Sequence, residues 1–174
     1  MASNRHLGRI VALQSLYEYE LRQNLNDKSL DLKKLVKRNL GHYENEIGDK
    51  KYVLDLVENV AKQANQLDAR LQPVAPDWPI KQISAIDRAV LRMSLYELEH
   101  LGEKVPPKVV INEAVELAKS FGSDNSSKFI NGVLGTIYRE MEGESDEVTE
   151  APEELKGKDE GKSRKEEDLQ EAID

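Results

Sequence analysis

The chain contains no cysteine, so it has neither a disulfide framework nor a thiolate metal site. Its three histidines, His6, His42 and His100, stand far apart and lack the spacing of an HExxH metal site. The GxSxG, GxGxxG and phosphate-binding glycine motifs are also missing. These absences predict a binding protein without catalytic residues, metal or cofactor.

Long apolar runs are missing as well. No segment approaches the roughly 18 apolar residues that span a bilayer. The opening residues, MASNRHLGRI, lack the apolar stretch of a signal peptide. We therefore expect a soluble, cytoplasmic protein that does not contact membranes.

Charge is distributed unevenly along the chain. The net charge is −8, but residues 140–174 hold 15 acids and 5 bases, so residues 1–139 carry a net charge of about +2. A mildly basic body leaves nucleic acid open as a ligand. The acidic end has no Phe, Tyr or Trp and too few apolar residues to offset the entropy of ordering. We expect a helical domain over residues 1–143 and a disordered acidic tail over residues 144–174.

Apolar periodicity predicts an all-α domain of six or seven helices, because no alternating β-branched run appears. Helices are expected at about residues 4–23, 27–40, 49–72, 79–83, 84–101, 106–121 and after Gly122. Asp27 and Ser84 are expected to cap helices, and Ser123 or Asp124 to cap the last one. The helix at 84–101 is apolar on two sides, which is typical of a central helix or of one packed on a partner.

The segment 109–135, VVINEAVELAKSFGSDNSSKFINGVLG, predicts two amphipathic helices around a tight turn. It resembles the INEAxELAK and KFxNGVL helices of the NusB family. The segments IDRAVLRMSLYEL at 86–98 and RIVALQSLYEYEL at 9–21 resemble two further helices of that family. The resemblance covers about residues 5–140 and implies two small helical bundles packed together.

The resemblance also implies a function. NusB proteins pair with NusE, a small-subunit ribosomal protein, and the heterodimer binds single-stranded boxA RNA of ribosomal RNA operon transcripts. It then joins other Nus factors in a complex on RNA polymerase that resists termination. One alternative is the NusB-like domain of ribosomal RNA cytosine methyltransferases. Those enzymes carry a catalytic domain after it, and the acidic tail leaves no room for one here. Another is a helical adaptor without RNA contact. Family members occur as monomers and as homodimers, so a homodimer remains open.

The first helix carries a small basic group. Arg5 and Arg9 lie one turn apart, with His6 and the amino terminus nearby. Two such arginines alone are typical of a solvated helix edge. The resemblance implies an RNA contact instead, because the family uses an arginine-rich amino-terminal segment. Leu7 and Gly8 stand where some relatives are basic.

A second group surrounds the turn after Gly122. Phe129 lies near the edge of its apolar stripe beside Lys128, where a ring can stack a base and the amine can neutralise a phosphate. The alternative is that Phe129 is an ordinary core residue. Asn125 shares the polar side, Ser126 lies at a helix start with free N–H donors, and Lys119 flanks the turn.

Two further aromatic residues have alternative roles. The helical angle of Tyr17 places it towards the core with Leu13 and Leu21, with its hydroxyl at the rim of the RNA site. Trp78 lies in a proline-rich connection, where it either stacks a base or closes the end of a bundle.

The predicted partner surface lies on helix 84–101. Asp87 matches an acidic family residue that contacts NusE, and Arg88, Arg92, Tyr96 and Glu97 follow it along the helix. An alternative role for Asp87 is a capping box with Ser84, in which the two residues exchange hydrogen bonds at the start of the helix.

Overall fold

The structure is a computed structural model that describes residues 4–143. Every regular element in this range is helical, which confirms the predicted fold class. The expected tail at 144–174 lies outside the described residues. The elements are α1 (Arg5–Asn24), α2 (Leu32–Gly41), α3 (Lys50–Lys62), α4 (Ala64–Leu71), η1 (Gln72–Val74), η2 (Ile80–Gln82), α5 (Ala85–His100), α6 (Pro107–Phe121) and α7 (Ser126–Met141).

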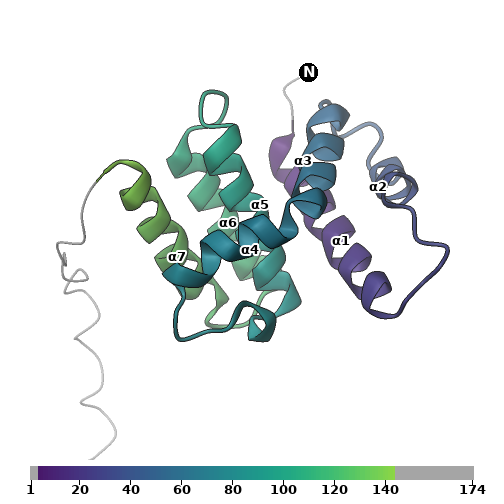
Figure 1. The fold of residues 1–174 in the computed structure, drawn as a ribbon. Helices are drawn as coiled ribbons and strands as arrows, with labels where there is room; N and C mark the ends of the chain where they lie inside the picture. Colours follow the sequence, from purple (N-terminus) through teal and green to yellow (C-terminus); the bar gives the residue numbers. More distant parts are fainter. Residues whose placement is uncertain (1–3, 144–174) are drawn as a thin grey trace, which may run out of the picture. The chain divides into compact units, whose positions relative to one another are not determined.

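The helices form two groups that meet at α5 (Figure 1). In the first group α1, α2 and α3 all contact one another, and in the second α5, α6 and α7 do so with α4 against α5. α5 contacts helices of both groups, including α1 and α3. Its two apolar sides are therefore both covered, as expected for a central helix.

Local signals at the start of α5 and the end of α6 appear as predicted. The Asp87 N–H donates to Ser84 Oγ at 3.2 Å, so Ser84 caps α5. α6 ends at Phe121, directly before Gly122. A Cβ atom at Gly122 would lie 2.5 Å from Ser126 Oγ and 2.7 Å from the Ala118 carbonyl oxygen. Only glycine therefore allows this turn to close tightly.

The predicted start of α2 is wrong. Asp27 does not cap the helix, because its carboxylate accepts hydrogen bonds from the backbone N–H and hydroxyl of Ser29 and from Arg22 Nε. These bonds stabilise a turn between α1 and α2. Asp31 provides the cap instead, accepting from Lys34 N at 3.1 Å.

The single helix predicted at 49–72 is also wrong, because Gln63 separates α3 from α4. Gln63 leaves the helical region at ψ 11°. Leu67 and Leu71 of α4 are fully buried in a helix that packs on α5. Tertiary packing on α5 thus redirects the chain where the local sequence permits a continuous helix.

The crossing of α1 and α3 is unusually close. A Cβ atom at Gly8 would lie 3.0 Å from Cγ2 of Val53, a fully buried residue of α3. Val53 would have to move to admit any side chain at residue 8. Gly8 therefore sets how closely α1 approaches α3.

Candidate nucleic-acid interface

Arg9 lies inside the molecule, 4% exposed. Its Nε and Nη2 donate to the two carboxylate oxygens of Glu97 on α5 at 2.9 and 2.7 Å. The Tyr52 hydroxyl on α3 donates to Glu97 Oε1 at 2.9 Å. The three side chains join α1, α3 and α5 through one buried carboxylate.

Burial and the charge of Glu97 together set the pKa values of this network. Burial disfavours the charge of Arg9, but the hydrogen bond and the attraction of Glu97 outweigh it and raise the Arg9 pKa. Burial, followed by the negative charge of Glu97, raises the pKa of the Tyr52 hydroxyl far above its ordinary value. The network thus keeps a charged pair and a neutral phenol. Arg9 and Glu97, predicted to bind RNA and partner, are both occupied by these internal contacts.

Arg5 and His6 lie at the rim of the same end of α1. The Arg5 guanidinium lies 4.8 Å from the centre of the Tyr52 ring and 3.6 Å from Asp49 Oδ2. His6 Nδ1 lies 2.7 Å from Glu113 Oε2 on α6, and the His6 side chain is 51% exposed. Both side chains remain accessible at a junction of α1, α3 and α6.

The turn between α6 and α7 is closed by Ser126, not by the predicted Ser123 or Asp124 cap. Asn125 occupies the cap position of α7 without a side-chain hydrogen bond. The buried Ser126 hydroxyl accepts from Ser123 N at 2.8 Å and donates to Asp87 Oδ2 at 2.9 Å. Because its hydroxyl links the turn to α5, Ser126 supports the site rather than presenting its side chain to a ligand.

A cavity of about 440 Å³ opens beside this turn. Trp78 and Phe129 line it with their rings in an edge-to-face arrangement, 6.5 Å between centres. Trp78 is 58% exposed and Phe129 is partly buried, so neither ring is an ordinary core residue. Lys128 and Asn125 are exposed at the same cavity. The arrangement offers aromatic faces beside a cation, which suits an unstacked base and its phosphate.

Asp87 also lines this cavity and is 8% exposed. One carboxylate oxygen accepts from Ser126, and the other, Oδ1, has no hydrogen-bond partner among the described residues. The capping box with Ser84 is therefore only half formed. No sequence pattern connects Trp78 with Phe129 and Asp87, because only tertiary packing brings these three residues together.

The expected core position of Tyr17 is wrong. Tyr17 is 40% exposed, and Leu21 and Leu25 on the same side of α1 are 48% and 71% exposed. The buried residues of α1 end at Leu16. A helical angle gives the side of a helix but not how far along it the neighbouring helices reach. Tyr17 and Leu21, on the second half of α1, and Leu25, its C-cap residue, form an exposed apolar stripe, which we call the α1 stripe.

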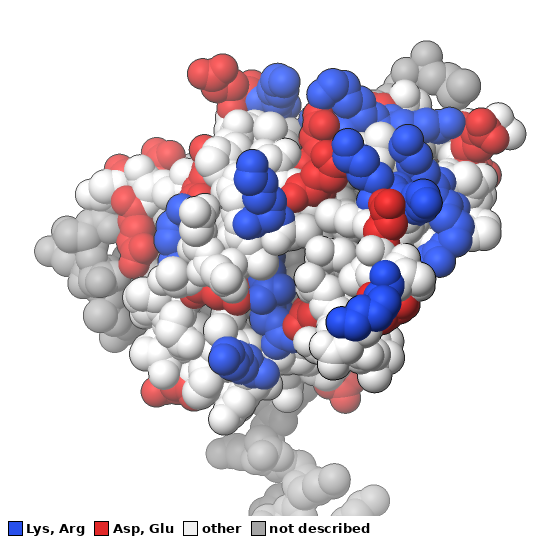
Figure 2. Space-filling view, turned by 45° about the vertical axis from the view of Figure 1, so that its right-hand side comes forward, with Lys and Arg blue, Asp and Glu red and all other residues white. Residues whose placement is uncertain are grey.

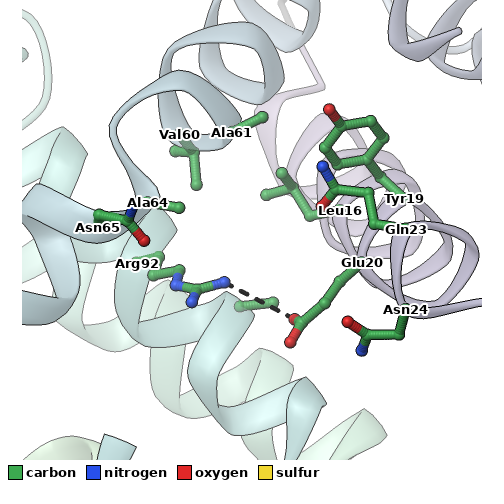
Figure 3. Close-up of a pocket in the computed structure, with 11 residues that line it drawn as sticks. Leu16, Tyr19, Glu20, Gln23, Asn24, Val60, Ala61, Ala64, Asn65 and Arg92 are labelled. Carbon is green, nitrogen blue, oxygen red and sulfur yellow. Dashed lines mark ion pairs between the residues drawn. The ribbon is translucent and has the colours of Figure 1, made fainter. Parts of the chain in front are cut away.

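A groove of about 220 Å³ lies next to this half of α1 (Figure 3). Glu20 of α1 reaches across it to Arg92 of α5, with Nη1 and Oε2 3.6 Å apart. Arg92 also makes two 2.7 Å hydrogen bonds to the Asp68 carboxylate on α4. Arg88 pairs with Glu20 and donates to the carbonyl oxygen of Ile83 at 2.7 Å.

The predicted partner residues therefore do not form one surface. Arg88 and Arg92 face α1 and α4, Asp87 faces α7, and Glu97 points into the interior. The Tyr96 ring packs against His100, with centres 4.6 Å apart.

Comparison with known sequences tests the family resemblance that the helical motifs indicate. The sequence model described as "NusB family" matches residues 6–139. This chain belongs to the NusB family. A relative from Roseiflexus castenholzii, named transcription antitermination protein NusB, is 42% identical over 80% of this chain and 97% of its own length. A protein of the same name from Chloroflexus aggregans is 43% identical over 79% of this chain and 88% of its own length.

Solved structures share the fold. T. maritima NusB matches with a TM-score of 0.70 and 30% identity, covering 80% of this chain and 94% of that one. A structure described as antitermination factors NusB and NusE in complex with dsRNA matches with a TM-score of 0.66 over 80% of this chain and 99% of that one. At 23% identity, the second match shows the fold alone.

The family match includes all predicted site residues except Arg5, and it ends before the acidic tail. The relatives are named as antitermination proteins and not as enzymes, in agreement with the predicted binding role. Among residues 4–143, no helix has the length and apolar character needed to cross a membrane.

Proposed function

We propose that this chain is a cytoplasmic transcription antitermination factor. It binds boxA RNA of ribosomal RNA operon transcripts as a heterodimer with NusE and joins other Nus factors on RNA polymerase. The observation that carries the proposal is the 42% identity to an antitermination protein over 97% of that protein's length. A match over nearly the whole relative also favours this function over a domain of a methyltransferase.

The proposed RNA surface runs along α6 between two groups of residues. Arg5 and His6 lie at one end, where His6 contacts Glu113 of α6. Lys119, near the end of α6, leads to the cavity with Lys128 and Phe129. Trp78 joins this surface, whereas Arg9 is excluded because its guanidinium is buried and paired.

The proposed NusE surface is the α1 stripe and the adjoining start of α5, where the predicted partner contact Asp87 lies. An exposed apolar stripe of Tyr17, Leu21 and Leu25 gains free energy when a partner covers it. Arg88 pairs with Glu20, the α1 residue directly before Leu21 of the stripe. This assignment moves Tyr17 from the predicted RNA site to the partner surface.

The proposal is tested by titrating a fluorescent boxA oligonucleotide with the full chain, alone and with purified NusE. We expect boxA binding that NusE strengthens, and weaker binding of a scrambled oligonucleotide. If neither preparation prefers boxA, the adaptor without RNA contact is the better function.

A Leu21→Asp variant tests the partner surface separately. It should weaken NusE binding while preserving the affinity of the free chain for boxA. Light scattering of the unliganded chain shows whether a second copy covers the same stripe as a homodimer. Unchanged NusE affinity would move the partner surface away from α1.

A further inference from the structure

α2 has an unusual charge composition for a surface helix. Its ten residues, LKKLVKRNLG, include four cations and no acid. Lys33, Lys34, Lys37 and Arg38 are all exposed, and we call them the α2 basic face.

The cations share one side of the helix because of their spacing. At 100° per residue they occupy a sector of about 140°. Leu35, Val36 and Leu40 are buried on the opposite side. Lys33 and Lys37 lie about 6 Å apart along the helix, as do Lys34 and Arg38. The result is two parallel rows of outward-pointing charge.

Much of this charge has no counterion on the protein. Lys33 is 3.9 Å from Glu58, and Arg38 pairs with Glu18. Lys34 and Lys37 make no ion pair with any residue in the described range 4–143. Lys33 and Lys34 stand in the first turn of α2, where the carboxylate of the cap residue Asp31 offsets part of the local positive charge.

The basic face continues towards the proposed RNA surface. Figure 2 shows Lys and Arg side chains gathered on one part of the molecular surface, with acidic side chains among them. Lys50 and Lys51 begin α3 and pair with Glu44 and Asp55, and the cap residue Asp49 contacts Arg5 at 3.6 Å. Lysines thus lie between the α2 basic face and Arg5, each beside an acidic neighbour.

We propose that the α2 basic face is a second RNA contact, which binds phosphates of the transcript flanking boxA. The inference rests on the proposed RNA-binding function. α2 has no aromatic residue, so the contact reads no bases and acts through charge alone. Its rows of cations suit an extended chain of phosphates, and its continuity with Arg5 places that chain on the same molecule of RNA.

The test compares the full chain with a Lys34→Ala, Lys37→Ala variant on two RNAs. One is a minimal boxA oligonucleotide, and the other carries natural flanking sequence on both sides. Alanine keeps α2 helical. We expect the variant to bind the long RNA about three- to tenfold more weakly at low salt and the minimal RNA within about twofold of the original chain. Loss of two phosphate contacts should also reduce the log–log salt slope for the long RNA by about 1.4.

A matched control is Lys62→Ala, Arg139→Ala. These two cations are also exposed, lie at the ends of α3 and α7 and outside the proposed RNA surface, and make no ion pair within residues 4–143. The control removes the same net charge. An equal loss in control and α2 variant would show a general charge effect and overturn the proposal.

The remaining outcomes also decide the question. Unchanged binding of the long RNA by the variant, or equal loss with both RNAs, overturns the second contact. The proposed function still stands in that case if the original chain binds boxA. A fall in affinity for polyglutamate with no change for RNA would assign the face to an acidic protein. If the original chain fails to bind boxA at all, the proposed function itself fails.

Discussion

α5 carries two buried carboxylates with different surroundings. Glu97 accepts two hydrogen bonds from Arg9 and one from Tyr52, and it is 1% exposed. Asp87, ten residues earlier, accepts one hydrogen bond from Ser126 and borders the cavity with Trp78 and Phe129. The two positions are about 15 Å apart along the helix.

The difference separates a carboxylate whose hydrogen bonds are complete from one whose hydrogen bonds are incomplete. A buried carboxylate whose oxygens are all hydrogen-bonded holds its neighbours in place, because removing one partner leaves a costly unpaired charge. A buried oxygen without a partner has an incomplete hydrogen-bond set. Asp87 Oδ1 is such an oxygen, so Asp87 is less firmly held than Glu97, and it borders the cavity where we expect binding.

The largest effect should follow from breaking the Glu97 network. Arg9→Ala leaves Glu97 buried without its cation, and we expect the free energy of unfolding to fall by about 3–5 kcal/mol. Urea denaturation measures this change. A loss below about 1 kcal/mol would show that the buried pair does not support the fold.

A combined Arg9→Leu, Glu97→Leu, Tyr52→Phe variant provides the control. It removes every polar group of the network together, so no charge remains unpaired, and stability should recover most of the loss. Persistent instability would point to packing around α1 rather than to charge.

At the Asp87 end, Phe129→Ala should act on binding. If the ring stacks a base, RNA affinity should fall by about 1–3 kcal/mol, as measured by anisotropy. Phe129→Leu keeps apolar volume without the ring and should lose a similar amount. Recovery of binding with leucine would mean that Phe129 acts only through packing.

Asp87→Asn should have a smaller effect, a loss of about 1 kcal/mol in NusE affinity from the missing charge. Asp87→Lys should weaken the complex further by charge reversal. Melting temperatures of both variants separate this role from helix capping. Equal destabilisation of the free chain by both, with normal NusE affinity, would contradict a partner contact.

The smallest effect concerns Asp27, which is remote from both carboxylates. Hydrogen bonds from Ser29, followed by that from Arg22, lower the Asp27 pKa from 3.8 to about 2. A depressed folded-state pKa adds stability above the unfolded value, and this stability is lost as pH falls from 3.8 through about 2. Asp27→Ala should therefore flatten the dependence of stability on pH in that window. An unchanged slope would show that the turn does not hold this carboxylate.

The sequence predicts the helix positions and caps that depend on residues close together in the chain. Periodicity placed α5 and α6 correctly, and Ser84 caps α5 as expected. How deeply each side chain is buried could not be predicted from neighbouring residues. Arg5 and Arg9 stand one turn apart on α1, yet only Arg9 is buried. Its partner Glu97 lies 88 residues further along the chain, so no local pattern predicts this contact. The Trp78–Phe129 pair likewise depends on the path of the connection between α4 and α5.

The close crossing at Gly8 has a consequence for any attempt to strengthen RNA binding by design. An added arginine at residue 8 would bring charge to the amino-terminal end of α1, but its Cβ would lie 3.0 Å from Val53 Cγ2, so Val53 would have to shift to admit it. Arg9, the next residue, holds Glu97 with hydrogen bonds of 2.9 and 2.7 Å, so even a small shift of α1 would strain this buried pair. A cation added to the surface at residue 8 would therefore act against the internal cation beside it.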